Sequence, residues 1–433
     1  MIITTIKNLF EDKDKVRLLR DLYGKQSGSL VYQLERFTDL LKKHDAFSSR
    51  AADPRIFSAP GRIEIIGNHT DHNNGKVLAA AITFDTIAAV TLNDGGTVRL
   101  QSEYGDKYVK VEVPLDNLGA SGSYEKNTVR AIAVGALDIM RKRGVKLRGF
   151  DATLKSDVAG GSGLSSSAAF EVLLLLIVDA LFSEDSGAER LSAVERAELA
   201  QQIENNYYGK PSGLMDQMAS SVGGLVAIDF IGSPANVQPL HFDLEANGYS
   251  VVIVKPGGDH AGLTEHYAAI PHEMKQVASF FGKNVLREVD YGDIIKSVPT
   301  LRQSVSERAI LRALHYFDEN FRVGCAIAAV ANNNVHDFIG LVNESGDSSW
   351  ELLQNISAFP NKQPIAIALT LARRALSGNG AVRVMGGGFA GSILCLVRNE
   401  RLPAFVESMS AAFGDHSVDV LDIRQAGACE IPL

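Results

Sequence analysis

The sequence predicts an α+β protein with two domains, and three observations carry this prediction. Strand-like and helix-like patterns are mixed in both halves of the chain, without the regular alternation of a parallel βα fold. The chain has 433 residues, which is longer than a domain with a single hydrophobic core usually is. A Gly-Ser-Pro-Ala-Asn segment at 232–236 interrupts the patterns near the middle. We therefore expect domains at 1–245 and 246–433.

The first half opens with helical patterns and then changes to strands. Apolar residues at three- and four-residue steps predict helices at 8–22 and 30–43, within a helical lead-in at 1–50. Alternating and β-branched runs predict strands at 63–66, 87–92, 98–102 and 108–113. Helical patterns return at 128–143, 165–181, 192–208 and 214–221. The third of these helices begins with a capping box, Ser192 and Glu195.

The second half begins with a predicted strand at 249–254, which ends at a Lys-Pro-Gly-Gly turn. Apolar spacing predicts helices at 272–281, 307–321, 323–343 and 364–376. Two apolar strands, 381–385 and 392–397, flank a glycine-rich turn. A helix at 403–413 and a strand at 417–423 complete the expected order.

The composition excludes several classes of partner. With 43 basic and 51 acidic residues the net charge is −8, which argues against nucleic acid or an anionic membrane as the main partner. The apolar run at 172–181 is too short to cross a bilayer. The first residues lack the layout of a signal peptide, and three cysteines without metal-binding spacing fit a reducing compartment. We expect a cytoplasmic monomer that acts on small molecules.

The strongest local signal is the segment Gly-Gly-Ser-Gly-Leu-Ser-Ser-Ser-Ala at 160–168. Its glycines let the backbone approach an anion, and the helix that follows offers free N–H groups and a positive dipole end. A surface linker is the alternative, but linkers are not usually followed at once by an apolar helix. The segment has neither the Walker nor the Rossmann spacing. The residues expected to bind phosphate are Gly160, Gly161, Ser162, Gly163, Leu164, Ser165, Ser166 and Ser167.

A second polar segment at 67–75 follows the predicted strand at 63–66 and reads Gly-Asn-His-Thr-Asp-His-Asn-Asn-Gly. Asp and Asn side chains each offer two hydrogen-bonding atoms, which suits a ligand with neighbouring hydroxyl groups. A merely polar turn is the alternative, because Asn, Asp and Gly are common turn residues. The histidines His69 and His72, with Asp71, are a weaker alternative as metal ligands.

A third glycine-rich segment, Met-Gly-Gly-Gly-Phe-Ala-Gly-Ser at 385–392, could wrap the phosphate end of a nucleotide or close a hairpin. In chain order the three segments resemble the motifs of the GHMP kinases, and within that superfamily the galactokinases. The stretch from Pro60 to Asp71 is similar to the family signature Pro-Gly-Arg-Val-Asn-Leu-Ile-Gly-Glu-His-Thr-Asp-Tyr-Asn. The second segment matches Gly-Leu-Ser-Ser-Ser-Ala, and the third matches Gly-Gly-Gly-Phe-Gly-Gly with Ala390 for one glycine. A fourth stretch, 204–217, resembles the start of the family's catalytic helix.

The resemblance implies a catalytic pair and a metal site in the cleft of a two-domain GHMP kinase fold. Asp216 would take the proton from the sugar's anomeric hydroxyl, with Arg62 beside it; whether Asp216 acts as a base or positions the hydroxyl stays open. Ser167 and Glu204 would hold Mg²⁺, although which of the three serines binds the ion also stays open. From the residues alone, Asp216 would be a helix-start carboxylate and Arg62 a surface ion-pair partner.

The resemblance also implies ligand contacts. Asp71 would grip two ring hydroxyls of the sugar, with His69 beside it and Gly213 nearby. Tyr267 is a further expected sugar contact on a looser match. Gly387 and Gly388 are expected at the nucleotide, together with the phosphate-binding loop. The implied activity is phosphorylation of O1 of a galactose-type sugar, with ATP and Mg²⁺.

Asn68 is the main departure from the family pattern, which has at this position a glutamate that contacts the sugar's C6 hydroxyl. An amide can still bind that hydroxyl, but the site loses one negative charge at this position. A sugar with a C6 carboxylate, such as galacturonate, is therefore an alternative substrate. A catalytically weak sugar- and ATP-binding regulator is a further alternative, against which the intact Arg62, Glu204 and Asp216 count.

Overall fold

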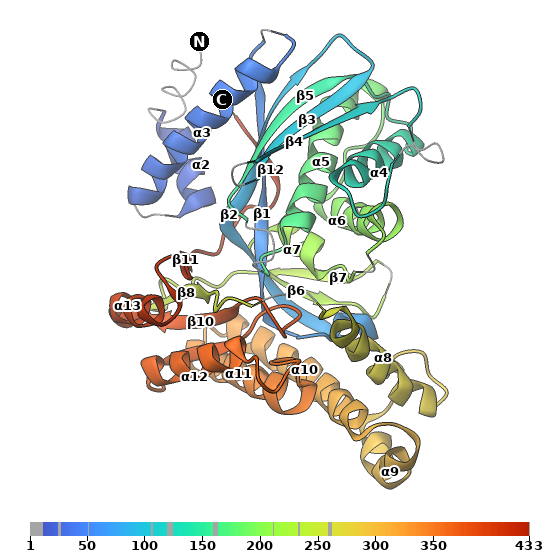
Figure 1. Cartoon of the computed structure of the whole chain (residues 1–433), viewed down its shortest axis with the longest axis vertical. Coiled ribbons are helices and arrows are strands. Elements are labelled where there is room, and N and C mark those ends of the chain that lie inside the picture. Colours follow the sequence, from blue (N-terminus) through green and yellow to red (C-terminus); the bar gives the residue numbers. More distant parts are fainter. Residues whose placement is uncertain are drawn as a thin grey trace.

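The computed structural model describes residues 12–24, 27–50, 52–104, 107–118, 124–158, 163–210, 212–232, 234–258 and 262–432. These residues form an α+β structure with a large and a small sheet, and helices cover both (Figure 1). Among the described residues, none of the helices combines the length and the apolar character that a bilayer span requires.

The large sheet is mostly antiparallel and takes most of its strands from the first half of the chain. Its main path runs β12-β1-β2-β5-β3-β4, and β6 and β7 extend it beside β2. β1 and β2 are buried along nearly their whole length, which explains their long apolar runs. The strands are β1 (Arg55–Ile66), β2 (Lys76–Leu92), β3 (Thr97–Tyr104), β4 (Lys107–Pro114), β5 (Phe150–Ser156), β6 (Leu225–Asp229), β7 (Asn236–Leu240) and β12 (Cys429–Ile431).

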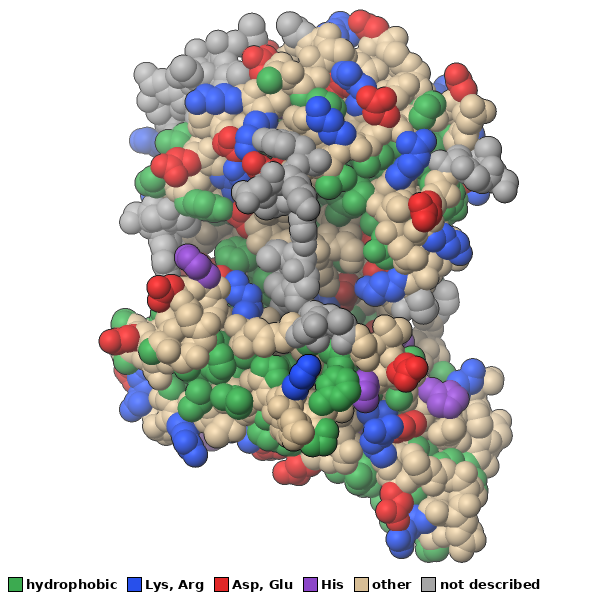
Figure 2. Space-filling view, viewed as in Figure 1, with side chains coloured by type: hydrophobic (Ala, Val, Ile, Leu, Met, Phe, Trp, Pro, Cys, Tyr) green, Lys and Arg blue, Asp and Glu red, His purple; other side chains and the backbone are tan. Residues whose placement is uncertain are grey.

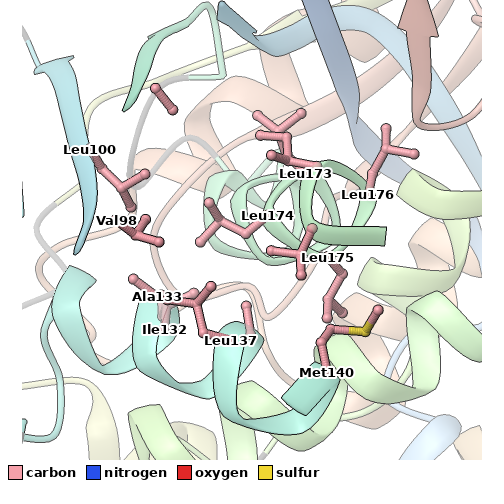
Figure 3. Close-up of a cluster of buried hydrophobic side chains, with 14 of the residues drawn as sticks. Val98, Leu100, Ile132, Ala133, Leu137, Met140, Leu173, Leu174, Leu175 and Leu176 are labelled. Carbon is pink, nitrogen blue, oxygen red and sulfur yellow. The ribbon is translucent and has the colours of Figure 1, made fainter. Parts of the chain in front are cut away.

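Helices cover both faces of this sheet. Phe57 and Ala88 pack toward α4 and α5, whereas their neighbours Ile56 and Ile87 pack toward α2 and α3, as the alternation along a strand requires. Figure 3 shows four consecutive leucines of α5 in the core between α4 and the sheet. The helices are α2 (Lys13–Tyr23), α3 (Ser27–Phe47), α4 (Val129–Lys142), α5 (Ser166–Phe182), α6 (Ala193–Gln202) and α7 (Met215–Val222).

The small sheet has the order β11-β8-β10-β9, and helices of the second half pack against it. One hydrophobic cluster joins Ile63 of the large sheet, Val323 and Phe338 of two helices, and Leu394 of the small sheet, so the two halves share a core. The elements are β8 (Tyr249–Val254), α8 (Thr264–Phe280), α9 (Tyr291–Ser304), α10 (Glu307–Ala331), α11 (Val335–Ser348), α12 (Pro364–Leu376), β9 (Gly380–Val384), β10 (Ile393–Arg398), α13 (Leu402–Phe413) and β11 (Val418–Leu421).

Most predicted elements are confirmed, but some predictions are wrong. The predicted break between helices at 322 does not exist: α10 continues to Ala331, and the chain turns where Asn333 adopts φ of 49° and Asn334 caps α11. The strand predicted at 63–66 is longer, because a bulge between Pro60 and Arg62 lets β1 run through the glycine between them. The strands β5, β6, β7 and β12 and the helix α9 were not predicted.

Candidate active site

Arg62 and Asp216 form a charged pair at the centre of the candidate site. Arg62 lies on β1, and Asp216 lies in the first turn of α7. The guanidinium donates to both carboxylate oxygens, with Nε–Oδ1 at 2.7 Å and Nη2–Oδ2 at 2.6 Å. Burial would raise the pKa of Asp216, but the charge and hydrogen bonds of Arg62 outweigh it and lower that pKa. The carboxylate is therefore held ionised and in one orientation.

The start of α5 closes over this pair. Ser165 has a left-handed backbone, with φ of 62°, immediately before the helix. Its hydroxyl donates to Asp216 Oδ2, and Arg62 Nη1 donates to the carbonyl of Gly163. The carbonyl of the buried Leu164 accepts from the backbone N–H of Arg62 at 3.0 Å. The predicted phosphate-binding residues that lie outside the described part of the chain are Gly160, Gly161 and Ser162.

Ser166 and Ser167 form the first turn of α5, and Ser167 approaches Glu204. Ser167 Oγ donates to Glu204 Oε1 at 3.4 Å, and Lys210 Nζ donates to the same oxygen at 3.0 Å. Glu204 lies in a π-helical stretch, Ile203–Tyr208, a geometry that is frequent at functional sites. Over the described ranges, no cluster of three or more His, Cys, Asp or Glu side chains could hold a metal ion. A hydroxyl and one carboxylate suit Mg²⁺ only if phosphate and water supply its other ligands.

Glu171 has a buried carboxyl group that lies behind Glu204. It was not predicted as a site residue from the sequence. Gln217 Nε2 donates both to Glu171 Oε2 at 3.1 Å and to Glu204 Oε2 at 2.8 Å. Burial, followed by the charge of Glu204, raises the pKa of Glu171 well above its ordinary value. The signal that could have identified it is its position four residues after Ser167, which places both on one helix face.

The polar turn after β1 brings His69 and Asp71 against two glycine positions. His69 has φ of 59°, and its Nε2 donates to the carbonyl of Gly387 at 3.2 Å. Burial and then the neighbouring His72 lower the pKa of His69 to about 4, so the ring is neutral at pH 7. Asp71 lies directly over Gly213, where a Cβ would come within 1.8 Å of Asp71 Oδ2. Only a residue without a side chain leaves this carboxylate in place.

Asp71 and Gly213 also line a polar cavity of about 410 Å³. Its walls include the side chains of Glu198, Gln201 and Gln202 from α6. Amide and carboxylate groups of this kind offer both donors and acceptors, which suits a ligand with several hydroxyl groups.

Helix α10 fixes the backbone of the same turn from the second half of the chain. Glu319 Oε1 accepts from the backbone N–H groups of Gly67 at 2.8 Å and Asn68 at 3.3 Å. His315 Nε2 donates to the carbonyl of Asn68 at 2.9 Å. Arg322 donates to the other oxygen of Glu319, which balances its buried charge. Residues 315 and 319 are one helical turn apart, so both reach the turn from one face of α10.

Asn68 is fully buried, and its amide group is bonded within the protein. Its Nδ2 donates to Glu64 Oε1 at 2.9 Å and to the carbonyl of Gly386 at 2.7 Å, and its Oδ1 accepts from Asn355 Nδ2 at 2.8 Å. Both hydrogens of the amide are therefore used. Asn68 joins β1 to the third glycine segment, and its contact with a sugar hydroxyl stays a prediction.

The third glycine segment lies against Tyr267 and borders the segment that is predicted to bind phosphate. Tyr267 donates its hydroxyl to the carbonyl of Gly388 at 2.8 Å, and a Cβ on Gly387 would lie 2.7 Å from Tyr267 Cε1. Gly388 has φ of 80°, which favours glycine. At the start of the segment, Met385 Cε is 3.3 Å from the position of a Cβ on Gly163. The described residues predicted for phosphate, sugar and metal binding thus form one continuous region.

Two family models match the segments that build this region. Residues 43–92 match the galactokinase galactose-binding signature, and residues 128–224 match the GHMP kinases N terminal domain. Galactokinase of Glaesserella parasuis serovar 5 (strain SH0165) is 33% identical over 362 residues, which is 82% of this chain and 88% of that protein. Galactokinase of Streptomyces coelicolor is 32% identical over 366 residues, 84% of this chain and 89% of that protein.

Solved structures show the same fold. The crystal structure of Lactococcus lactis galactokinase complexed with galactose matches with a TM-score of 0.75 at 24% identity, covering 92% of this chain and 99% of that one. A crystal structure of mevalonate kinase matches with a TM-score of 0.59 at 15% identity, and the match covers 85% of this chain and 98% of that one. These likenesses confirm the predicted α+β GHMP kinase fold. With relatives of this identity and coverage, the chain belongs to the galactokinase family of the GHMP kinases.

Proposed function

We propose that the protein is a galactokinase that transfers the γ-phosphoryl group of ATP to O1 of galactose, in a reaction that requires Mg²⁺. The observation that carries the proposal is the bidentate Arg62–Asp216 pair, joined to the hydroxyl of Ser165 at the start of α5. It puts an ionised carboxylate beside a helix N-terminus, where phosphate groups bind favourably. The completeness of this pair also favours an enzyme over a regulator that only binds.

In the proposed reaction, O1 of the sugar forms a bond to the γ-phosphorus while the bond from that phosphorus to the β–γ bridging oxygen breaks, and ADP leaves. Asp216 accepts the hydrogen bond of the O1 hydroxyl, in place of the one it now receives from Ser165. Arg62 keeps the carboxylate ionised through this step. The transition state of such transfers is loose, so Asp216 can act by positioning the hydroxyl as well as by accepting its proton.

For the nucleotide, we propose that the loop ending in residues 163–167 and the first turn of α5 bind the phosphates, with Gly387 and Gly388 opposite. Ser167 and Glu204 would hold Mg²⁺, and Lys210 now shares the glutamate oxygen. When bound, Mg²⁺ would offset charge on the phosphate oxygens. Gly160, Gly161 and Ser162, which lie outside the described residues, belong to the same proposal because of their place in the glycine-rich sequence.

For the sugar, we propose contacts from His69, Asp71 and Gly213, with Asn68 and Tyr267 at its edge. The position of Asp71 over Gly213 and beside a polar cavity supports this assignment. We also propose that 1–245 and 246–433 are the two domains, with the site in the cleft between them and the protein a cytoplasmic monomer.

The test is the release of ADP by purified protein with galactose, ATP and Mg²⁺. Asp216→Ala should lower kcat by about a thousandfold, because a positioned carboxylate contributes roughly 10²–10⁴-fold to such reactions. Asp185→Ala is a matched control, since that side chain is 73% exposed on the surface. Undiminished turnover in Asp216→Ala would remove this residue from the mechanism.

A further inference from the structure

Lys210 is a cation of the candidate site that the proposed reaction does not use. It follows the π-helical stretch Ile203–Tyr208, and its backbone N–H donates to the carbonyl of Glu204 at 3.1 Å. Its Nζ donates to Oε1 of the same glutamate at 3.0 Å. The side chain of Glu204 is 3% exposed, whereas that of Lys210 is 59% exposed. A buried carboxylate is thus paired with a cation that reaches it from the solvent side.

The carboxylate of Glu204 is fixed from its other side. Gln217 Nε2 donates to Glu204 Oε2 at 2.8 Å and to Glu171 Oε2 at 3.1 Å. Ser167 Oγ, in the first turn of α5, donates to Glu204 Oε1 at 3.4 Å. The oxygen Oε1 is therefore the one that faces the start of α5, and Lys210 binds to this oxygen.

Lys210 and a bound Mg²⁺ ion would compete for Glu204 Oε1. An ammonium group 3.0 Å from this oxygen would lie beside an ion bound to it, and like charges so close together repel each other. Lysine carries its charge at the end of a long flexible side chain. Lys210 can therefore leave Oε1 while its backbone N–H stays bonded to the carbonyl of Glu204.

The phosphate groups need a cation that Arg62 does not supply. Arg62 donates from Nε and Nη2 to Asp216 and from Nη1 to a backbone carbonyl, so each of its three nitrogens is already bonded. Burial would lower the pKa of Lys210, but the charge and hydrogen bond of Glu204 and then the charge of Asp216 raise it. The ammonium group thus lies near both carboxylates of the proposed mechanism, beside the helix start where phosphate binds favourably.

We propose that Lys210 is a phosphate-binding residue, which leaves Glu204 when Mg²⁺ and ATP bind and donates to an oxygen of the γ-phosphoryl group. In that place it offsets the negative charge on the oxygens of this group while the group is transferred. In the protein without nucleotide, the same ammonium group is the counter-ion of Glu204. The inference rests on the proposed function and adds a residue to its mechanism.

The experiment separates a contact with the γ-phosphoryl group from the ion pair with Glu204. Wild type is compared with Lys210→Met, which removes the charge, and with Lys210→Arg, which keeps it. Lys142→Met is the matched control: Lys142 is 65% exposed, and its Nζ lies 2.8 Å from a carboxylate that is 3% exposed, that of Asp138. This control removes a similar ion pair that contains no predicted site residue.

Two nucleotides are bound in turn in the presence of Mg²⁺. Isothermal titration calorimetry gives the Kd of ADP and the Kd of the β,γ-imido analogue of ATP, which carries a γ-phosphoryl group that is not transferred. The value of kcat is measured separately with galactose, ATP and Mg²⁺.

Lys210→Met should weaken binding of the ATP analogue about tenfold, because it removes a charge-assisted hydrogen bond. The Kd of ADP should not rise, since ADP lacks the γ-phosphoryl group and the lysine no longer competes with Mg²⁺ for Glu204. We expect kcat to fall about a hundredfold, because a donor to the charge of the transition state is lost. Lys210→Arg should recover most of the affinity for the analogue and most of kcat, and Lys142→Met should match wild type.

Equal weakening of both nucleotides in Lys210→Met would overturn the inference, because it would show that the lysine acts only by holding Glu204. An unchanged Kd for the analogue or an unchanged kcat would overturn it as well. If Lys210→Met does not fold, Lys210→Gln, which can still donate to Glu204 but has no charge, is measured with the same expectations.

Failure of the proposed function has a different result. A wild-type protein that phosphorylates no sugar would refute that function, whereas the two nucleotide affinities would still decide whether Lys210 contacts the γ-phosphoryl group. A wild-type protein that binds neither nucleotide would refute both.

Discussion

Gly213 leaves room for the carboxylate of Asp71, which lies where a side chain would otherwise begin. The contact is with the end of a side chain, so Gly213→Ala should fold and displace Asp71 instead. We expect KM for galactose to rise at least about tenfold, because small misplacements of a positioning group are costly, with KM for ATP unchanged. Steady-state kinetics with each substrate varied in turn checks this. Gly324→Ala on α10, where a Cβ meets open space, is the control; an equal effect there would contradict the assignment.

His44 gives stability a dependence on pH. Its ring is buried between the hydroxyls of Thr91 and Thr153, and burial lowers its pKa from 6.5 to about 4. Because the folded pKa is depressed, this stabilisation is present above pH 6.5 and is lost as the pH falls toward 4. Between pH 7 and 4.5 the loss amounts to about 2 kcal/mol. Urea unfolding at both pH values should show a smaller decrease for His44→Gln than for wild type; equal decreases would show that His44 does not titrate in this way.

Candidate site residues such as Arg62 and Asp216 could be proposed from the sequence, but their contacts could not. Arg62 and Asp216 are separated by 154 positions, and only packing of α7 beside β1 brings their side chains together. Asn68 was predicted as a ligand contact on its motif position, whereas its amide bonds to Glu64 and Gly386. Hydrogen-bond partners of this kind depend on the second half of the chain, which local patterns do not encode.

At the scale of elements, α10 positions the polar turn at 67–75, because Glu319 accepts hydrogen bonds from the backbone N–H groups of this turn. Glu319→Gln keeps the shape but removes the charge that pairs with Arg322. We expect about a tenfold rise in KM for galactose, which corresponds to roughly 1.4 kcal/mol. Glu344→Gln is the matched control, because Glu344 approaches the same arginine from the surface and is 64% exposed. Equal kinetics in the two variants would refute a positioning role for Glu319.

The lead-in helices show what periodicity can predict about an element. The apolar spacing at 8–22 and 30–43 predicts two helices, and α2 and α3 confirm them over the described residues. Their packing against the sheet, through Leu19, Phe37 and Leu40, was not predictable, because periodicity identifies a buried face but not what covers it. The edge strand β12 has only three residues, too few for a pattern, and its pairing with β1 depends on the whole fold.

At the scale of the whole molecule, the net charge of −8 is distributed and not concentrated. Acidic and basic side chains are interspersed over the face seen in Figure 2. This negative net charge of the sequence argues against a polyanionic partner. A nucleotide bound by backbone N–H groups and a metal ion needs no basic surface. The order of motifs along the chain was enough to predict the fold class. The hydrophobic cluster that joins the two halves could be identified only from the structure.

Whether the Arg62–Asp216 pair serves a sugar 1-kinase can be decided by ³¹P NMR of the product. Purified protein is incubated with galactose, ATP and Mg²⁺, and Asp216→Ala is run beside it. We expect one new phosphate ester, coupled to the anomeric proton and formed in equal amount to ADP, and about a thousandfold slower formation of this ester with the variant. A phosphate on another hydroxyl, or no sugar phosphate although both substrates bind, would contradict it.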